Sequence, residues 1–327
     1  MTRRVLTGIK PTGTPHLGNL LGAFRPALRL ADEGLDAMYF IADYHALTTV
    51  KDRAQLARYT HEVAATWLAL GLDPERTLFY RQSDVPEIFE LSWVLACFTS
   101  KGWLDRAHAY KSAMAAGDTE INMGLYTYPV LMAADILAFD SDLVPVGKDQ
   151  DQHVEIARDI AQRVNHMVGH DVLRVPAARI EHDSAVVPGT DGRKMSKSYG
   201  NTIPLFATAA ERKKIIGRIV TDSTPPEAPK DPATSTIFEL YRAVATPAEA
   251  EALAARYRSG IGWGEAKQAL ADRLEQELAI PRARYQELIA DPARLDGILA
   301  AGAEKARAYA RGVLERVRVA IGISRPR

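Results

Sequence analysis

The hydrophobic positions in the first half of the chain follow two alternating spacings. Short runs of β-branched and aromatic residues predict strands, and longer stretches with apolar residues every three to four positions predict amphipathic helices. This alternation of strand and helix is typical of an α/β protein with a doubly wound parallel sheet. The expected strands are residues 4–7, 37–41, 77–80 and 143–146, and the expected helices are residues 17–30, 55–70, 86–97 and 150–164.

A proline-rich segment precedes a second region of different composition. Residues 222–232 contain four prolines, which exclude a continuous helix or a central strand. Alanine, leucine, glutamate and arginine dominate beyond it, and we expect a helical bundle with stops near residues 260–264, at Pro281 and at residues 291–292. The predicted domains are residues 1–205 with a helical insertion around 100–135, a linker over 206–232, and a helical region over 233–327.

Composition narrows the class of protein. The 327 residues are 47% hydrophobic and 25% charged, as in globular proteins, and no apolar run approaches the roughly 20 residues of a membrane span. The first eight residues reach a glycine before an apolar signal core develops, so we expect a cytoplasmic protein. A single cysteine, Cys97, excludes an internal disulfide and a cysteine-based zinc cluster. We expect Cys97 in the core and no dedicated metal site.

Charge is balanced overall but uneven along the chain. The 41 basic residues match 41 acidic ones, which argues against a protein that coats nucleic acid through a large positive field. Residues 193–218 nevertheless contain seven basic residues against one acidic residue, and residues 303–327 contain seven against two. Each patch taken alone is interpreted more readily as a solvated helix face than as a binding surface.

The first candidate site for chemistry is the turn after the first strand. Residues 8–15 lead into His16, Leu17, Gly18 and Asn19, which open the next helix. Free N–H groups and the positive end of the helix dipole suit an anion, and Gly18 lets a flat ring lie against the backbone. His16 and Asn19 can donate hydrogen bonds to phosphate oxygens. The alternative is an ordinary strand–helix turn with a capping histidine.

The second candidate is a basic loop over residues 188–201. Lys194 and Lys197 have two residues between them, with glycines on both sides of the pair. Phosphoryl and nucleotidyl transfer need positive charge where negative charge develops, and a flexible loop can close after ATP binds. The pattern is not the G-x-x-x-x-G-K-[ST] phosphate loop. The alternative is a solvated basic turn.

The third candidate is the apolar block over residues 127–137. Tyr128, Met132 and Asp135 fall on one face of a predicted helix, and Asp135 has apolar neighbours on both sides. A buried carboxylate needs a partner, and the donor-only N–H of an indole matches it. The thioether of Met132 can pack against an aromatic ring. The alternative pairs Asp135 with an arginine or histidine elsewhere in the core.

These motifs together resemble those of class I aminoacyl-tRNA synthetases. Residues 16–19 are similar to their HIGH element, and residues 194–198 match their KMSKS element at every position. With the central block and residues 144–150, the chain most closely resembles the bacterial tryptophanyl-tRNA synthetases over nearly its whole length. It departs from them at Lys10, where many carry glutamine, and at Lys148, where many carry an acid.

The resemblance implies a Rossmann-like catalytic domain and a helical domain. The implied reaction activates L-tryptophan with ATP, which brings Mg²⁺, and transfers the amino acid to tRNA(Trp), in a cytoplasmic homodimer. The helical region and its basic tail are then expected to bind the anticodon arm. The implied catalytic residues are His16, Lys194 and Lys197. The implied ATP contacts are Lys10, Pro11, Thr12, Gly18, Asn19, Gly147, Lys148, Asp149, Val186, Lys194, Met195, Ser196, Lys197 and Ser198. The implied tryptophan contacts are Leu6, His45, Tyr128, Met132, Asp135, Val144, Val146 and Gln150.

Three rival functions stay open at this level. A tyrosine-activating enzyme of the same class shares both nucleotide motifs, and only the block from Met132 to Asp135 speaks against it. A paralogue that binds RNA or regulates without charging tRNA is disfavoured by the intact lysines. A small-molecule adenylyltransferase leaves the helical region without a task.

Overall fold

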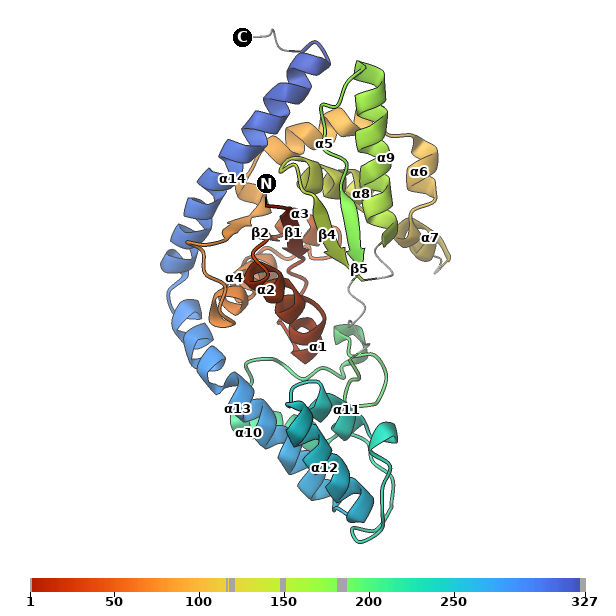
Figure 1. The fold of residues 1–327 in the computed structure, drawn as a ribbon, viewed down its shortest axis with the longest axis vertical. Helices are drawn as coiled ribbons and strands as arrows, with labels where there is room; N and C mark the ends of the chain where they lie inside the picture. Colours follow the sequence, from red (N-terminus) through yellow and green to blue (C-terminus); the bar gives the residue numbers. More distant parts are fainter. Residues whose placement is uncertain (1, 116, 118–120, 148–150, 181–186, 324–327) are drawn as a thin grey trace.

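The computed structural model describes residues 2–115, 117, 121–147, 151–180 and 187–323 (Figure 1). Five parallel strands form one sheet in the order β3-β2-β1-β4-β5. Their bounds are Arg4–Ile9 (β1), Asp36–Ile41 (β2), Leu78–Arg81 (β3), Leu143–Val146 (β4) and Ala177–Ile180 (β5). The α/β fold class is thereby confirmed, and the four predicted strands are all present. The fifth strand was missed because this edge strand is partly exposed and has no run of buried apolar residues.

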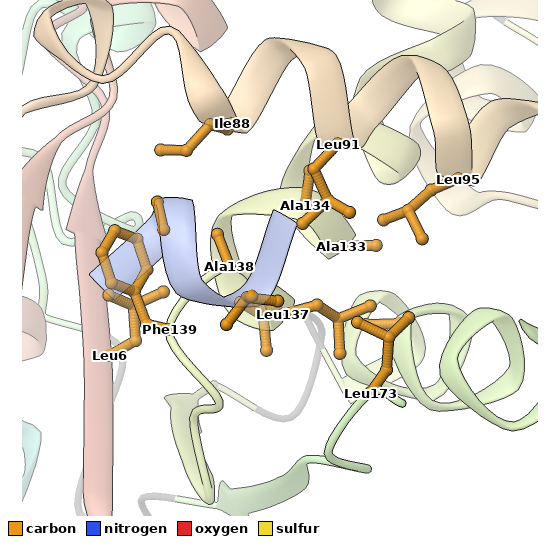
Figure 2. Close-up of a cluster of buried hydrophobic side chains, with 14 of the residues drawn as sticks. Leu6, Ile88, Leu91, Leu95, Ala133, Ala134, Leu137, Ala138, Phe139 and Leu173 are labelled. Atoms are coloured by element: carbon orange, nitrogen blue, oxygen red, sulfur yellow. The ribbon is translucent and has the colours of Figure 1, made fainter. Parts of the chain in front are cut away.

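Helices cover both faces of the sheet. In β2, Met38 and Phe40 point into one hydrophobic cluster, while Tyr39 and Ile41 point into the other. The first cluster fills the space between the sheet and the helices on one face, where Leu6 and Phe139 lie below Leu91 and its neighbours (Figure 2). The helices of this half are α1 (Leu17–Asn19), α2 (Arg25–Asp32), α3 (Asp43–Ala46), α4 (Arg53–Ala69), α5 (Glu87–Phe98), α6 (Lys101–Asp105), α7 (His108–Ala115), α8 (Met123–Leu137) and α9 (Asp151–Val168).

The helix expected over residues 17–30 is present but irregular. A π-helical turn, Leu20–Phe24, separates α1 from α2. Such turns are rare in proteins, and those that occur are often found at functional sites. Three 3₁₀ turns complete the local structure, at Gln82–Asp84, Lys197–Tyr199 and Pro232–Thr234.

The C-terminal half contains five helices in the described residues. They are α10 (Ala209–Gly217), α11 (Thr236–Arg242), α12 (Pro247–Ser259), α13 (Trp263–Ile289) and α14 (Pro292–Ala320). The predicted stop at Pro281 is wrong, because α13 continues through it. An internal proline costs a helix about 3 kcal/mol, but α13 packs against α4, α10 and α11 along its length, and this packing outweighs the loss.

Two domain boundaries differ from those expected. The interval 206–232 is not a linker throughout, since it contains α10, which packs against α13. The last helix, α14, packs against β3 and α5 of the sheet domain and not with α11 and α12, which lie at the opposite end of the molecule (Figure 1). Gly302 permits this contact, because a β-carbon there would lie 1.7 Å from the carbonyl oxygen of Phe79.

Four arginines of the basic tail form ion pairs in the described part of the chain. Arg307 and Arg311 both bind the carboxylate of Glu87, at 3.1 and 2.8 Å. Arg316 forms a further ion pair with Asp140, and Arg318 forms pairs with Glu90 and Glu315. These arginines fasten α14 to the sheet domain.

Cys97 corrects a further expectation. It was assigned to the core, but it is exposed near the end of α5. The apolar face of α5 turns other residues inward, including Leu91 and Leu95. Among the described residues, no helix combines the length and the apolar character that crossing a membrane requires.

Candidate active site

The candidate site lies at the carboxyl ends of the parallel strands, where ligands bind in open α/β sheets. A cavity of about 360 Å³ opens there, within the range of about 300–1,000 Å³ that is usual for small-molecule sites. The strands β1, β2 and β4 and the helices α3, α8 and α9 supply its walls. The lining residues are Leu6, Gly8, Lys10, Phe40, Ala42, His45, Thr48, Leu125, Tyr128, Met132, Asp135, Ile136, Val144 and His153.

Asp135 is the buried acid of this cavity, with 1% of its surface exposed. The Nε2 amide of Gln82 donates to both carboxylate oxygens, at 2.8 and 3.0 Å, and Nε2 of His45 lies 2.8 Å from Oδ2. Burial raises the pKa of Asp135, and the hydrogen bonds from His45 and Gln82 oppose that rise. An ionised carboxylate has about four acceptor positions, so these three contacts leave room for one more donor.

The predicted helix face is confirmed as a geometric unit. Tyr128, Met132 and Asp135 all project from α8 into the cavity. The hydroxyl of Tyr128 hydrogen-bonds Nε2 of His153, from the first turn of α9. Burial raises the pKa of Tyr128 to about 12, so its hydroxyl stays protonated and keeps a hydrogen to donate.

Sequence reasoning missed Gln82 and His153. Gln82 directly follows β3, and residues at the ends of parallel strands reach this edge of the sheet. That signal was sufficient to select Gln82. No comparable signal was available for His153, whose place depends on how α9 packs against α8.

The other expected amino-acid contacts are distributed as follows. Leu6, His45 and Val144 line the cavity, whereas Val146 is buried but is not among its lining residues. Lys10, expected on the nucleotide side, lies in this same cavity. Its Nζ donates to Oγ1 of Thr48 at 2.7 Å, and burial lowers its pKa.

The segment around His16 pairs with the segment that follows the lysine loop. The backbone N–H of Leu17 donates to the carbonyl of Ile203 at 2.9 Å, and Leu205 N–H donates to Pro15 at 3.0 Å. The residues that follow the lysine loop therefore pair with the residues around His16. Two segments far apart in the sequence therefore lie side by side.

His16 lies at the N-cap of α1 and is a neutral group. Burial, and then the charge of Lys197, lower its pKa to about 4. The imidazole is therefore uncharged near pH 7 and offers one N–H donor. The backbone N–H of His16 is satisfied by Oδ1 of Asn19, at 3.0 Å.

The lysine loop is anchored by its methionine. Met195 is buried, and its Sδ accepts from the N–H of Gly18 at 3.3 Å. The side chain of Lys197 extends toward the turn that precedes His16. Its Nζ lies only 3.0 Å from the position that a β-carbon on Gly13 would take. Lys194 and Ser198 are exposed at the loop surface, and Ser196 is half-buried.

The remaining expected contacts lie at strand ends or outside the description. Pro11 and Thr12 follow β1, and Gly147 follows β4. Lys148, Asp149, Gln150 and Val186 lie outside the described residues. Within the part of the chain that the structure describes, no three His, Cys, Asp or Glu side chains are arranged to hold a metal ion.

Comparisons with known proteins agree with this geometry. The family model of class I tRNA synthetases (W and Y) matches residues 2–279. Tryptophan–tRNA ligases from Xanthomonas axonopodis pv. citri and Pseudomonas putida are 54% and 53% identical to the chain, over 99% of its length and 77% and 74% of theirs. A tryptophanyl-tRNA synthetase from Campylobacter jejuni, solved with ADP and tryptophan, superposes with a TM-score of 0.91 at 45% identity, over 98% of this chain and 99% of that one. The chain therefore belongs to the family of class I tRNA synthetases (W and Y).

Proposed function

We propose that this protein is a tryptophan–tRNA ligase. It activates L-tryptophan with ATP to tryptophanyl-adenylate and pyrophosphate, and it then transfers the amino acid to tRNA(Trp). The observation that carries the proposal is Asp135, a buried carboxylate with an acceptor position left for an indole N–H in the wall of the cavity. The tryptophan-specific relatives with over half of their residues identical support it.

The first step needs no protein nucleophile. The tryptophan carboxylate attacks the α-phosphorus of ATP in line, and pyrophosphate leaves with the Mg²⁺ that ATP brings. Holding the two substrates in this alignment is worth about 7–11 kcal/mol. Lys194 and Lys197 place positive charge where the phosphates gain negative charge, and neutral His16 donates a hydrogen bond there.

The amino-acid cavity supplies the alignment. Met132 packs on the indole ring, and Asp135 accepts from its N–H. The α-amino group is then directed toward Tyr128, with Gln150 as its second partner. Lys10 lines the same cavity, and we assign its ammonium to the substrate carboxylate and to the α-phosphate that the carboxylate attacks.

The second step is transfer to tRNA. A ribose hydroxyl at the 3′ end attacks the mixed anhydride, and AMP leaves. We assign anticodon-arm binding to α11, α12 and α13, since the arginines of α14 are engaged with the sheet domain. Exposed Lys213 and Lys214 of α10, and Arg218 directly after it, remain available for tRNA phosphates.

We also propose a cytoplasmic homodimer. On α5, Trp93 is 73% exposed, and Cys97 lies one turn further along the helix. Tyr44, in α3, is partly exposed and packs on Phe89 of α5, with ring centroids 4.3 Å apart. A second copy of the chain covers such an apolar patch. Sedimentation of wild type and Trp93→Glu tests this: wild type should be dimeric and the variant monomeric.

The deciding experiment is ATP–pyrophosphate exchange measured with each of the twenty amino acids. Tryptophan should support exchange at a kcat/KM at least about a thousandfold above tyrosine. The tyrosine hydroxyl is also a donor, but it lies at the tip of a single ring and not at the side of a fused ring pair, so it does not match the acceptor position of Asp135. A preference for tyrosine contradicts the assignment and supports the tyrosine-activating alternative. Exchange with none of them indicates a non-charging RNA-binding protein.

A further inference from the structure

The lysine loop is folded as a narrow hairpin. Met195 N–H donates to the carbonyl of Val187 at 2.8 Å, and Gly189 N–H donates to Arg193 at 2.7 Å. The chain then returns beside this hairpin at Asn201, whose carbonyl accepts from Thr190 N–H at 3.0 Å. The loop therefore has a preferred backbone conformation.

The side chain of Asn201 lies inside this hairpin, with only 2% of the residue exposed. Its Oδ1 accepts from Ser196 N–H at 2.8 Å, and its Nδ2 donates to the carbonyl of Lys194 at 3.1 Å. The amide orientation is fixed by these partners, because a backbone N–H only donates and a carbonyl only accepts. Nδ2 also donates to Oδ1 of Asp191 at 2.7 Å.

Gly189 makes room for this amide. A β-carbon at Gly189 would lie 2.3 Å from Cγ of Asn201, closer than real side chains approach. The Asn201 amide is thus enclosed and holds the peptide groups on both sides of Met195. Since Met195 itself contacts Gly18 at the start of α1, Asn201 sets the distance between the lysine loop and the first motif.

We propose that Asn201 is a positioning residue for adenylate formation, with Asp191 as its partner. Its amide fixes the backbone between Lys194 and Lys197, so that the Lys197 ammonium meets the phosphates in the transition state. Asp191 keeps the amide in place through one of its two donor hydrogens. This inference rests on the proposed function, because it concerns the loop that acts on ATP.

Only an amide satisfies all three contacts. A carboxylate at position 201 still accepts from Ser196, but it cannot donate to Lys194 and it repels the carboxylate of Asp191. Restoring one amide and one carboxylate, by exchanging the two side chains, removes that repulsion. The pair therefore offers a test in which two harmful changes partly compensate each other.

The experiment measures tryptophan-dependent ATP–pyrophosphate exchange in four variants. We expect Asn201→Asp to lower kcat about tenfold or more with little change in KM for tryptophan, because the transition state loses correctly placed charge. Asn201→Ala, which adds no charge, should show a loss of similar size. The exchanged pair Asp191→Asn with Asn201→Asp should recover about fivefold over Asn201→Asp alone. Asp191→Asn by itself controls for the lost acid.

A Lys197→Ala background separates positioning from general damage. If Asn201 acts through Lys197, adding Asn201→Asp to Lys197→Ala should lower kcat less than about threefold further. A full additional loss overturns the proposed route, as does the absence of any recovery in the exchanged pair. Wild-type kcat in Asn201→Asp, with an active wild type, overturns this inference alone. An inactive wild type overturns the proposed function as well.

Discussion

Nε2 of His45 lies 2.8 Å from Oδ2 of Asp135, although the two residues are 90 positions apart in the sequence. The same carboxylate receives the amide of Gln82, which is 53 positions away. A core partner and a ligand-binding role for Asp135 were alternatives at the level of the sequence. In the structure His45 and Gln82 bind the carboxylate, and the carboxylate also lines the cavity, where the proposed ligand-binding role requires it.

Asp135→Asn should weaken tryptophan activation while ATP binding stays intact. The NH2 group of an asparagine here would face the donor groups of His45 and Gln82. The amide would then turn, and its oxygen would no longer be positioned to accept from the indole N–H. We expect KM for tryptophan to rise about tenfold to a hundredfold, as when a buried polar match is lost. Exchange kinetics measure the change, and ATP affinity serves as the internal control. Unchanged affinity for tryptophan would remove the indole assignment.

Lys197→Ala should act on the rate and not on amino-acid binding. Its ammonium lies near Gly13 and His16, away from the indole cavity. We expect kcat for exchange to fall about a hundredfold, and KM for tryptophan to stay within about twofold. Lys213→Ala is the matched control, since Lys213 is exposed on α10 and exchange requires no tRNA. Equal behaviour of the two variants would contradict the role of Lys197.

His16 predicts a specific pH dependence of stability. Its pKa is lowered from 6.5 to about 4 in the folded protein, so between these values the unfolded chain binds a proton that the folded chain does not. The free energy of unfolding should therefore fall as pH falls through this window. Urea unfolding at about pH 7 and about pH 5 measures the loss, which should be smaller in His16→Gln. Identical losses in both proteins would disprove it.

Glu275→Ala should destabilise the protein more than Arg212→Met. Arg212 is buried in α10, with a side chain 1% exposed, and pairs with Glu275 of α13 at 2.7 Å. Without Glu275 this buried charge loses its partner, at a cost of about 3 kcal/mol. Without Arg212, Glu275 keeps its pair with Arg282. Urea unfolding of the two variants compares the costs, and the reverse order would contradict this account.

Gly302→Ala should loosen α14. Its new methyl group collides with the Phe79 carbonyl, so the helix must move from β3, at a cost of about 1–3 kcal/mol. Gly297→Ala on the same helix is the matched control, because no atom lies within 4 Å of its β-carbon position. That variant should gain about 0.5–1 kcal/mol from helix propensity. Chemical denaturation distinguishes them, and similar values would show that the close contact is absent.

The fold was predicted well where local pattern carries the information. Strands β1 to β4 each contain at least two buried apolar residues, and the stop at residues 291–292 is real because Asp291 caps α14. Prediction failed at β5, at Pro281 and at Cys97. In each of these cases the outcome depends on which neighbour packs against the element, and periodicity along the chain does not report that.

By itself, the amino-acid order determined the secondary-structure pattern, the two signature motifs and the three residues on one face of α8. These features depend on backbone preferences and spacings within a few residues. Only the tertiary structure decided which charges are free and which are neutralised. In a count of charges, Arg307 and Arg311 are equivalent to Lys194. In the structure, however, both arginines bind Glu87, which is more than two hundred positions away. Such pairings arise where distant segments cross, so a count of charges along the chain does not report which of them a ligand can meet.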